Sequence, residues 1–229
     1  MSASRVPISD SRPLRIAVLV SGRGSNLQAL IDAIAAGRLG VEIVGVFSDR
    51  RDATALQRAR AAGIPAIADD PRDHATRLAF DAALFARIDA IAPDLIVCAG
   101  YMRLISEPAV QAHRGRLVNI HPSLLPAFKG LRTHAQALVA GVDAHGASVH
   151  YVTPDLDGGP VIAQARVPVH AGDDVESLGR RVLAREHPLL VETVALIAAD
   201  RIALREDLVM LDGMPLSTPL QLAANNRFA

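Results

Sequence analysis

From Arg15 onward, short runs rich in β-branched residues alternate with longer stretches rich in alanine and leucine. This alternation is typical of strands connected by covering helices. The first run, residues 16–20, is apolar at every position, as expected for a central parallel strand that is buried on both faces. We therefore predict an α/β fold: an open, mostly parallel twisted sheet with helices on both faces, Rossmann-like, and an antiparallel addition in the C-terminal half.

The same patterns predict the order of the elements. In the first half we expect strands at residues 16–20, 41–47, 64–68 and 94–98, and helices at 25–36, 52–62 and 74–92. In the second half we expect strands at 118–120, 147–152 and 161–169, and helices at 133–140 and 175–198. The last two strands are expected to pair antiparallel through the turn at 155–160. Three units are predicted along the chain: a loose N-terminal tail (1–14), a single domain (15–207) and a C-terminal tail (208–229).

Composition excludes several function classes. The chain has 24 Lys+Arg against 24 Asp+Glu, and aromatic residues make up 3% with no Trp, so a nucleic-acid partner is not expected. No apolar run approaches the roughly 18 residues of a membrane span, and the first 14 residues lack the apolar core of a signal peptide. We expect a cytoplasmic protein without a membrane partner. A monomer and a homodimer remain open.

The turn Ser21-Gly22-Arg23-Gly24-Ser25-Asn26 follows the first predicted strand and leads into a predicted helix. Backbone N–H groups and the helix dipole favour an anion there, and a phosphate fits this geometry. Two glycines let the backbone approach a ligand closely, while Ser25 and Asn26 are expected to offer both side-chain hydrogen bonds and a cap for the helix. The dinucleotide fingerprint fails at Leu27, where a small residue is needed, and no P-loop is present. An ordinary tight turn is the alternative interpretation.

Asn119 and His121 flank Ile120 at the end of a predicted strand. Strand alternation directs both polar side chains to one face, at the edge where open α/β sheets bind ligands. Asn119 can donate a hydrogen bond to a developing oxyanion, and His121 can donate or accept a proton near neutral pH. Satisfied polar groups at a strand end are the alternative. Although five of the eight histidines lie between residues 113 and 150, their spacing is not that of a zinc site, and no metal is expected.

Asp157 lies in a glycine-rich turn. It is a candidate for the carboxylate that orients an imidazole and raises its pKa, with ordinary turn chemistry as the alternative. Cys98 stands in an apolar run without a base nearby in sequence, and no Gly-x-Ser-x-Gly motif is present. A covalent nucleophile is therefore not indicated, and direct transfer between two bound substrates is favoured.

Four segments carry a resemblance to a known family: Ser21-Gly22-Arg23-Gly24-Ser25-Asn26-Leu27-Gln28-Ala29, Ala99-Gly100-Tyr101-Met102-Arg103, Asn119-Ile120-His121-Pro122-Ser123-Leu124-Leu125-Pro126 and Leu156-Asp157-Gly158-Gly159-Pro160. Together they resemble the phosphoribosylglycinamide formyltransferase family. The resemblance runs from about Arg15 to Arg205. The third segment is shared by enzymes that use formyltetrahydrofolate, whereas the first points to the glycinamide ribonucleotide branch.

The resemblance implies a single α/β domain that passes a formyl group from 10-formyltetrahydrofolate to the amine of glycinamide ribonucleotide in de novo purine biosynthesis. It implies that Gly24, Ser25 and Asn26 hold the ribonucleotide phosphate and that Glu186 contacts the nucleotide substrate. It implies a folate site at Arg77, Met102, Arg103, Leu104, Ile105 and Asn119, closed by the loop of Thr153, Pro154, Asp155, Leu156 and Asp157.

The chemistry implied by the resemblance is attack of a neutral amine on the formyl carbon. Asn119 and protonated His121 would stabilise the negative oxygen of the tetrahedral species, and His121 would protonate the leaving folate nitrogen. Asp157 would favour the charged imidazole. His150 is assigned a supporting role, with a structural histidine as the alternative.

The chain departs from the commonest family pattern at Lys129 and Arg132. These residues are candidates for altering the nucleotide loop or, as a basic pair, for attracting the substrate phosphate. The main interpretation has three alternatives. A methionyl-tRNA formyltransferase is expected to carry an additional C-terminal domain, and a formyltetrahydrofolate hydrolase an additional N-terminal one, so both are disfavoured. A catalytically silent nucleotide-binding domain is disfavoured because Asn119, His121 and Asp157 occur together.

Overall fold

The computed structural model describes residues 12–228, and its centre is an eight-stranded sheet in the order β11-β7-β6-β5-β4-β1-β2-β3. The strands of this sheet are β1 (Leu14–Val20), β2 (Val41–Ser48), β3 (Ala66–Ala68), β4 (Leu95–Cys98), β5 (Leu117–His121), β6 (Ala144–Tyr151), β7 (Val161–Pro168) and β11 (Leu220–Gln221). The helices are α1 (Ser25–Ala35), α2 (Thr54–Ala61), α3 (Arg77–Ala90), α4 (Glu107–Ala112), α5 (Thr133–Val139), α6 (Val175–Ala198) and the short 3₁₀ turn η1 (Pro71–Asp73).

The sheet is mixed, as the sequence predicts. Strand β1 pairs in parallel with β2 and β4, and β3 and β5 extend the parallel part on either side. Strands β5, β6 and β7 are antiparallel neighbours, so the expected pairing through the turn at 155–160 is confirmed. Because the chain builds outward from β1 in both directions, the strand order reverses between β1 and β4, where sheets of this kind bind ligands.

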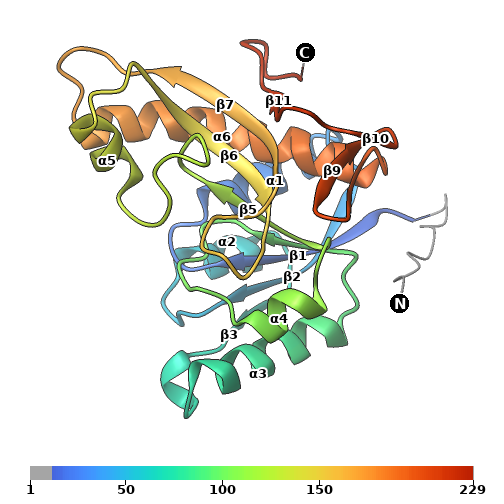
Figure 1. Ribbon diagram of the computed structural model, residues 1–229. Helices are drawn as coiled ribbons and strands as arrows, with labels where there is room; N and C mark the ends of the chain where they lie inside the picture. The colour runs from blue at the N-terminus through green and yellow to red at the C-terminus, as the bar shows by residue number, and fades with distance from the viewer. Residues whose placement is uncertain (1–11, 229) are drawn as a thin grey trace.

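Helices cover both faces of the sheet (Figure 1). Side chains of β1 alternate between two separate clusters of buried residues, with Val18 in one and Leu19 in the other. The first cluster includes apolar residues of α1, α2 and α6, and the second includes residues of α3 and α4. The apolar run at residues 16–20 is therefore explained by burial on both faces, and the predicted fold class is confirmed.

Several element boundaries differ from the predictions. Helix α3 begins at Arg77 rather than at His74, because the Thr76 hydroxyl accepts a hydrogen bond from the Ala79 N–H (3.1 Å) and caps the helix there. Helix α4 was not expected from the sequence; it begins after Ser106 with Pro108 in its first turn. The predicted N-terminal tail lies outside the described residues up to position 11, and Leu14 already belongs to β1.

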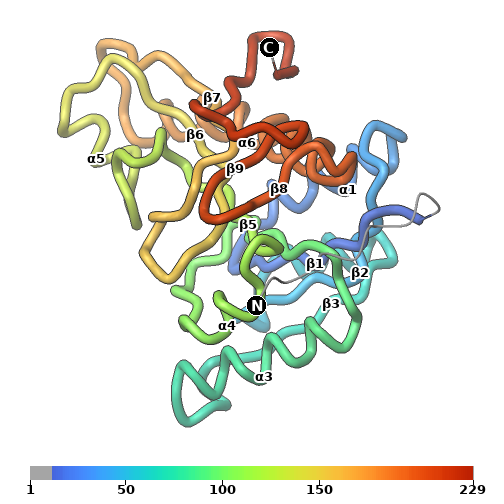
Figure 2. Tube along the Cα trace, turned by 45° about the vertical axis from the view of Figure 1, so that its right-hand side comes forward, coloured from blue at the N-terminus to red at the C-terminus, as the bar shows by residue number. Residues whose placement is uncertain are grey.

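The C-terminal stretch forms strands that the sequence did not suggest. Strands β8 (Ile202–Arg205), β9 (Leu208–Leu211) and β10 (Met214–Pro215) make a small antiparallel sheet, so the boundary expected after residue 207 falls at the turn of a hairpin. Strand β11 then returns to the main sheet beside β7. Arg185 of α6 donates hydrogen bonds to the carbonyls of Leu222 (2.9 Å) and Ala223 (2.7 Å), and the stretch lies beside α6 in both views (Figure 2).

Candidate active site

The turn after β1 is shaped by one glycine and supported by α2. Gly24 has a φ of 72°, and a Cβ atom there would lie 2.5 Å from the Cβ atom of Ala55, so glycine is required. Gly22 has open space around it and carries no such requirement. Two bonds from α2 hold the turn: the Ala55 N–H donates to the Gly22 carbonyl (3.0 Å), and Arg58 Nε donates to the Arg23 carbonyl (2.8 Å).

The first turn of α1 leaves backbone donors available at this point. Gly24 is the N-cap residue of α1, and no side chain caps the helix, so the expectation that Ser25 or Asn26 would cap it is wrong. The first intrahelical bond runs from the Gln28 N–H to the Gly24 carbonyl. The preceding N–H groups and the helix dipole therefore favour an anion, as the sequence suggested.

Asn26 instead makes a contact across 160 residues of sequence. Its Nδ2 donates to Oε2 of Glu186 in α6 (2.9 Å), while its Oδ1 is buried without a hydrogen-bond partner. Glu186 is only 8% exposed, and burial raises the pKa of its carboxyl group, partly offset by the Asn26 hydrogen bond. The structure thus brings together two of the residues predicted for the nucleotide side of the site.

His121 and Asp157 meet at the end of β5, and Asn119 is connected to them through His150, whose Nε2 lies 3.8 Å from Asp157 Oδ1 and 3.1 Å from Asn119 Nδ2. His121 Nδ1 lies 3.5 Å from Asp157 Oδ2, and His121 Nε2 bonds to the Phe128 carbonyl (3.0 Å). Each ring nitrogen therefore faces an oxygen acceptor, so a cationic imidazole is accommodated here. Asp157 is fixed in turn by the Gly130 N–H, which donates to its Oδ2 (2.8 Å).

His150 holds Asn119 from the neighbouring strand. His150 Nδ1 bonds to the Tyr151 carbonyl (2.9 Å) and therefore carries the proton, so Nε2 accepts from Asn119 Nδ2 (3.1 Å). Burial is the main cause that lowers the pKa of His150, so the neutral ring that this pattern requires is favoured. The second N–H of the Asn119 amide is left for another acceptor.

The predicted folate residues differ in their exposure and in their contacts. Met102 is 66% exposed, and Leu104 and Leu156 are also exposed, whereas Ile105 is buried. The guanidinium of Arg103 lies 5.2 Å from the centre of the Phe80 ring, and its Nε has no partner. The remaining predicted residues lie at the start of α3 and in the loop before β7: exposed Arg77, half-buried Thr153 with an unpartnered buried hydroxyl, and exposed Pro154 and Asp155.

Lys129 and Arg132, the two departures from the family pattern, lie in the loop before α5. A Cβ atom on Gly130 would lie 3.6 Å from Leu156 Cδ2, and one on Gly158 would lie 3.5 Å from Lys129 Nζ. The loop containing Lys129 is therefore adjacent to the loop at residues 155–158. Arg132 precedes α5 with a φ of 58°.

Three further features of residues 12–228 bear on the chemistry of the chain. Within residues 12–228, no group of three or more His, Cys, Asp or Glu side chains is arranged to hold a metal ion. Burial raises the pKa of the Cys98 thiol to about 12, so it is a poor nucleophile. In the same part of the chain, no helix is long and apolar enough to cross a membrane.

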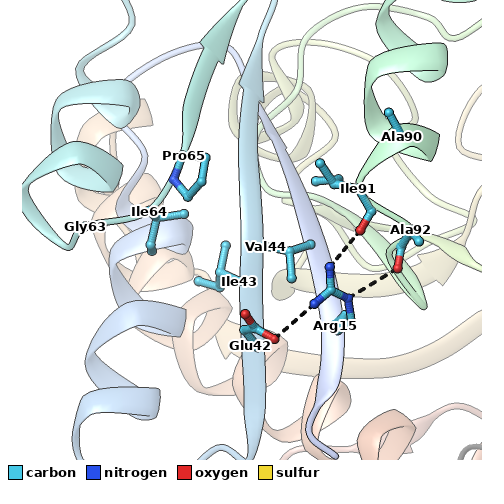
Figure 3. Close-up of a pocket in the computed structure, with 10 residues that line it drawn as sticks. All are labelled: Arg15, Glu42, Ile43, Val44, Gly63, Ile64, Pro65, Ala90, Ile91 and Ala92. Atoms are coloured by element: carbon cyan, nitrogen blue, oxygen red, sulfur yellow. Dashed lines mark hydrogen bonds and ion pairs between the residues drawn. The ribbon is translucent and has the colours of Figure 1, made fainter.

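A cavity of about 480 Å³ lies at the opposite, amino-terminal edge of the sheet (Figure 3). Its polar groups bond to one another: Arg15 donates to the carbonyls of Ile91 (2.8 Å) and Ala92 (3.4 Å) and pairs with Glu42 (3.4 Å). No residue predicted for the site lines it. The chemistry is therefore gathered at the carboxyl-terminal edge.

Two hydrogen bonds that support the site were not predicted from the sequence. Arg58 contacts the turn across 35 residues, and no local pattern signals such a contact. Ser21 was included in the turn motif without a role, although its hydroxyl accepts a hydrogen bond from the Met102 N–H (2.8 Å). The sequence signal that could have indicated the bond between Ser21 and Met102 was the adjacency of β1 and β4 expected in a doubly wound sheet.

Comparison with known proteins identifies relatives over most of the chain. The formyl transferase family model matches residues 14–194. The chain is 46% identical over 203 residues to the phosphoribosylglycinamide formyltransferase of Escherichia coli K12, covering 89% of this chain and 96% of that protein. Among solved structures, the phosphoribosylglycinamide formyltransferase of Coxiella burnetii is 47% identical with a TM-score of 0.87, covering 90% of this chain and 97% of that one. Glycinamide ribonucleotide transformylase 1 of Symbiobacterium toebii is 46% identical with a TM-score of 0.85, covering 92% and 99%.

Proposed function

The chain belongs to the formyl transferase family, and from this premise we propose that it acts as a phosphoribosylglycinamide formyltransferase. It transfers a formyl group from 10-formyltetrahydrofolate to the amine of N1-(5-phosphoribosyl)glycinamide, giving the N-formyl product and tetrahydrofolate in de novo purine (IMP) biosynthesis. The relatives at 46–47% identity bear this activity in their names and match the chain along nearly their whole length. Within the site, the meeting of Asn119, His121 and Asp157 supports the proposal most directly.

The first step is attack of the neutral amine on the formyl carbon. The formyl oxygen becomes negative, and the remaining N–H of Asn119 and a cationic His121 are the donors available to stabilise it. The bond from carbon to the folate nitrogen then breaks, and His121 supplies the proton to that nitrogen. Its Nε2 bonds to the Phe128 carbonyl in the structure, so a proton delivered from Nε2 requires the substrate to replace that acceptor.

Asp157 supports this cycle by its charge and position. Its Oδ2 lies 3.5 Å from His121 Nδ1, where the carboxylate can accept a hydrogen bond from the ring and hold its orientation. Attack by the neutral amine leaves an extra proton on the substrate nitrogen, and once His121 has protonated the leaving folate nitrogen, the His121–Asp157 pair can accept this proton, directly or through water. His150 keeps the Asn119 amide oriented from the other side of β5 and remains neutral itself.

The nucleotide is placed by the turn before α1. The uncapped N–H groups after Gly24 suit the phosphate, and the unpartnered Oδ1 of Asn26 provides an acceptor beside it. Glu186, which is bonded to Asn26, is placed to contact the amine side of the same substrate.

The folate is placed against the residues after β4 and the loop at 153–157. Exposed apolar side chains at Met102, Leu104 and Leu156 suit the flat ring system, and the unpartnered polar atoms of Arg103 and Thr153 suit its heteroatoms. Arg77 is exposed at the start of α3, where it is available to pair with a negative charge at the end of the folate that is remote from its ring system. We infer small-molecule substrates without a nucleic-acid or membrane partner, a cytoplasmic location, and a monomer or homodimer.

An assay with both substrates tests the proposed function. Purified protein is incubated with 10-formyltetrahydrofolate and the ribonucleotide, and formylated product and tetrahydrofolate are measured by mass spectrometry. Omission of the ribonucleotide separates a transferase from a hydrolase, because a hydrolase releases formate without it. Binding of the ribonucleotide without any formylated product would instead indicate a silent binding domain and contradict the proposal.

A further inference from the structure

The two proposed substrate sites begin at neighbouring strand ends. The nucleotide turn follows β1, and the proposed folate segment, residues 101–105, follows β4, which pairs directly with β1. This pair of strands is the place where the strand order reverses. Residues at the end of β1 are therefore able to act on both sites at once.

Ser21 makes the contacts between the two segments. Its N–H donates to the Gly100 carbonyl (3.0 Å), and its Oγ accepts from the Met102 N–H (2.8 Å). The residue is only 4% exposed, so neither bond is open to competition from bulk water. The second bond depends on the hydroxyl group, because alanine at this position offers no side-chain acceptor.

The Met102 backbone is held while its side chain is exposed. The N–H group of Met102 is bonded to Ser21, and the side chain is 66% exposed. At the other end of the segment, the Ser106 N–H donates to Oδ2 of the fully buried Asp81 (2.7 Å). The apolar side chains between these anchors are thus presented on a fixed backbone, an arrangement that lowers the ordering cost of binding a ligand.

We propose that Ser21 is a positioning residue shared by the nucleotide and folate sites: its hydroxyl sets the folate segment against the turn that receives the phosphate. This inference rests on the proposed function. Ser21 does not touch the reacting atoms, so it acts on how both substrates are held rather than on the chemical step.

Ser21→Ala tests this role through the division between KM and kcat. We expect KM for the folate substrate to rise about fivefold or more and KM for the ribonucleotide about threefold or more, with kcat within threefold of wild type. The smaller effect on the ribonucleotide follows from the further support that Ala55 and Arg58 give the turn. Ser21→Thr, which keeps the hydroxyl acceptor, should bring both KM values closer to wild type than Ser21→Ala does.

Thr193→Val is the matched control, because it removes another buried hydroxyl hydrogen bond, to the Leu189 carbonyl within α6 (2.7 Å). It should leave both KM values within twofold of wild type. Hydrogen exchange provides a readout independent of turnover: the Met102 amide should exchange at least tenfold faster in Ser21→Ala than in wild type.

The outcomes separate the two proposals. If wild-type protein forms no formylated product, the proposed function fails, while exchange at Met102 still measures the bond to Ser21. If wild type is active and Ser21→Ala leaves either KM within twofold, Ser21 is not shared by the two sites. Unchanged exchange at Met102 would likewise overturn the inference.

Discussion

At the scale of single residues, each proposed catalytic side chain is held by a partner from another part of the chain. Asn119 is bonded to His150 across the β5–β6 pair, and His121 faces Asp157 from the following loop. Alternation along β5 predicts that Asn119 and His121 belong to one site, because that relation is local. It cannot predict the bond between Asn26 and Glu186, because their separation of 160 residues is closed only by the packing of α1 against α6.

His121→Ala tests the assigned acid. We expect kcat to fall about 10²-fold or more, because the donor to the leaving nitrogen and one stabiliser of the oxyanion are both lost. The Kd of the ribonucleotide should change less than threefold, since the turn at Gly24 is untouched. Steady-state rates and titration calorimetry measure the two effects, with exposed His170→Ala as the control. Turnover near wild type would remove His121 from its role.

Gly24→Ala tests the shape of the phosphate turn, and Gly22→Ala in the same turn is its matched control. A methyl group on Gly24 meets Ala55 at 2.5 Å in a left-handed backbone, whereas Gly22 has open space. We expect Gly24→Ala to raise KM for the ribonucleotide at least tenfold, and Gly22→Ala to leave it within threefold. Equal effects of the two substitutions would show that the close approach to α2 is not what the turn requires.

At the scale of elements, α5 and β6 meet through two histidines. His134 Nδ1 and His145 Nε2 are 3.1 Å apart, so one ring donates and the other must remain unprotonated at that atom. Burial is the main cause that lowers the pKa of His145 from 6.5 to about 4, and it lowers the pKa of His134 as well. The Phe128 ring packs edge-on against His145, which places this contact directly behind the loop that bonds His121.

This contact predicts a loss of stability in acid. The unfolded chain takes up a proton on His145 below about pH 6.5, but the folded chain does so only near pH 4. Stability is therefore present above pH 6.5 and is lost as the pH falls through this window, by up to about 1.4 kcal/mol per pH unit. Urea unfolding at pH 7 and pH 5 measures the effect. The loss should be smaller in His145→Phe than in wild type, whereas His170→Phe at an exposed position should match wild type. An equal loss in His145→Phe would contradict the assignment.

The elements predicted from the sequence are those with strong local patterns. The central strands are runs of apolar residues, and α6 has the predicted bounds because Asp174 and Ser177 form a capping box at its start. The small sheet was missed because β8, β9 and β10 are only two to four residues long. A signal was present in Asp212-Gly213, a pair with φ values of 52° and 81° that suits a tight hairpin turn. Strand β11 has no such signal, since it exists only by pairing with β7.

At the scale of the whole molecule, the C-terminal stretch packs back onto the domain. Val209 and Leu222 belong to the same apolar cluster as α1, α2 and α6, and β11 extends the main sheet. Arg185 of α6 donates hydrogen bonds to two backbone carbonyls of the stretch and to the side chain of Asn226. We therefore propose that residues 208–228 fold as part of the domain rather than as an appended tail.

Two substitutions in neighbouring positions of β9 test this proposal. Val209 is 5% exposed and packs in the main cluster, whereas Leu208 is 54% exposed. Val209→Ala should destabilise the protein by about 2 kcal/mol, because it leaves a cavity in packed surroundings. For a chain of this size that corresponds to a fall in Tm of about 4–8 °C. Leu208→Ala should shift Tm by less than about 2 °C.

Deletion of residues 208–229 should lower Tm more than Val209→Ala does, because β9, β10 and β11 are lost together. Calorimetry of the three variants measures these shifts. A deleted chain that unfolds within 2 °C of wild type would show that the domain is complete without the stretch, and the bonds from Arg185 would then hold an independent tail.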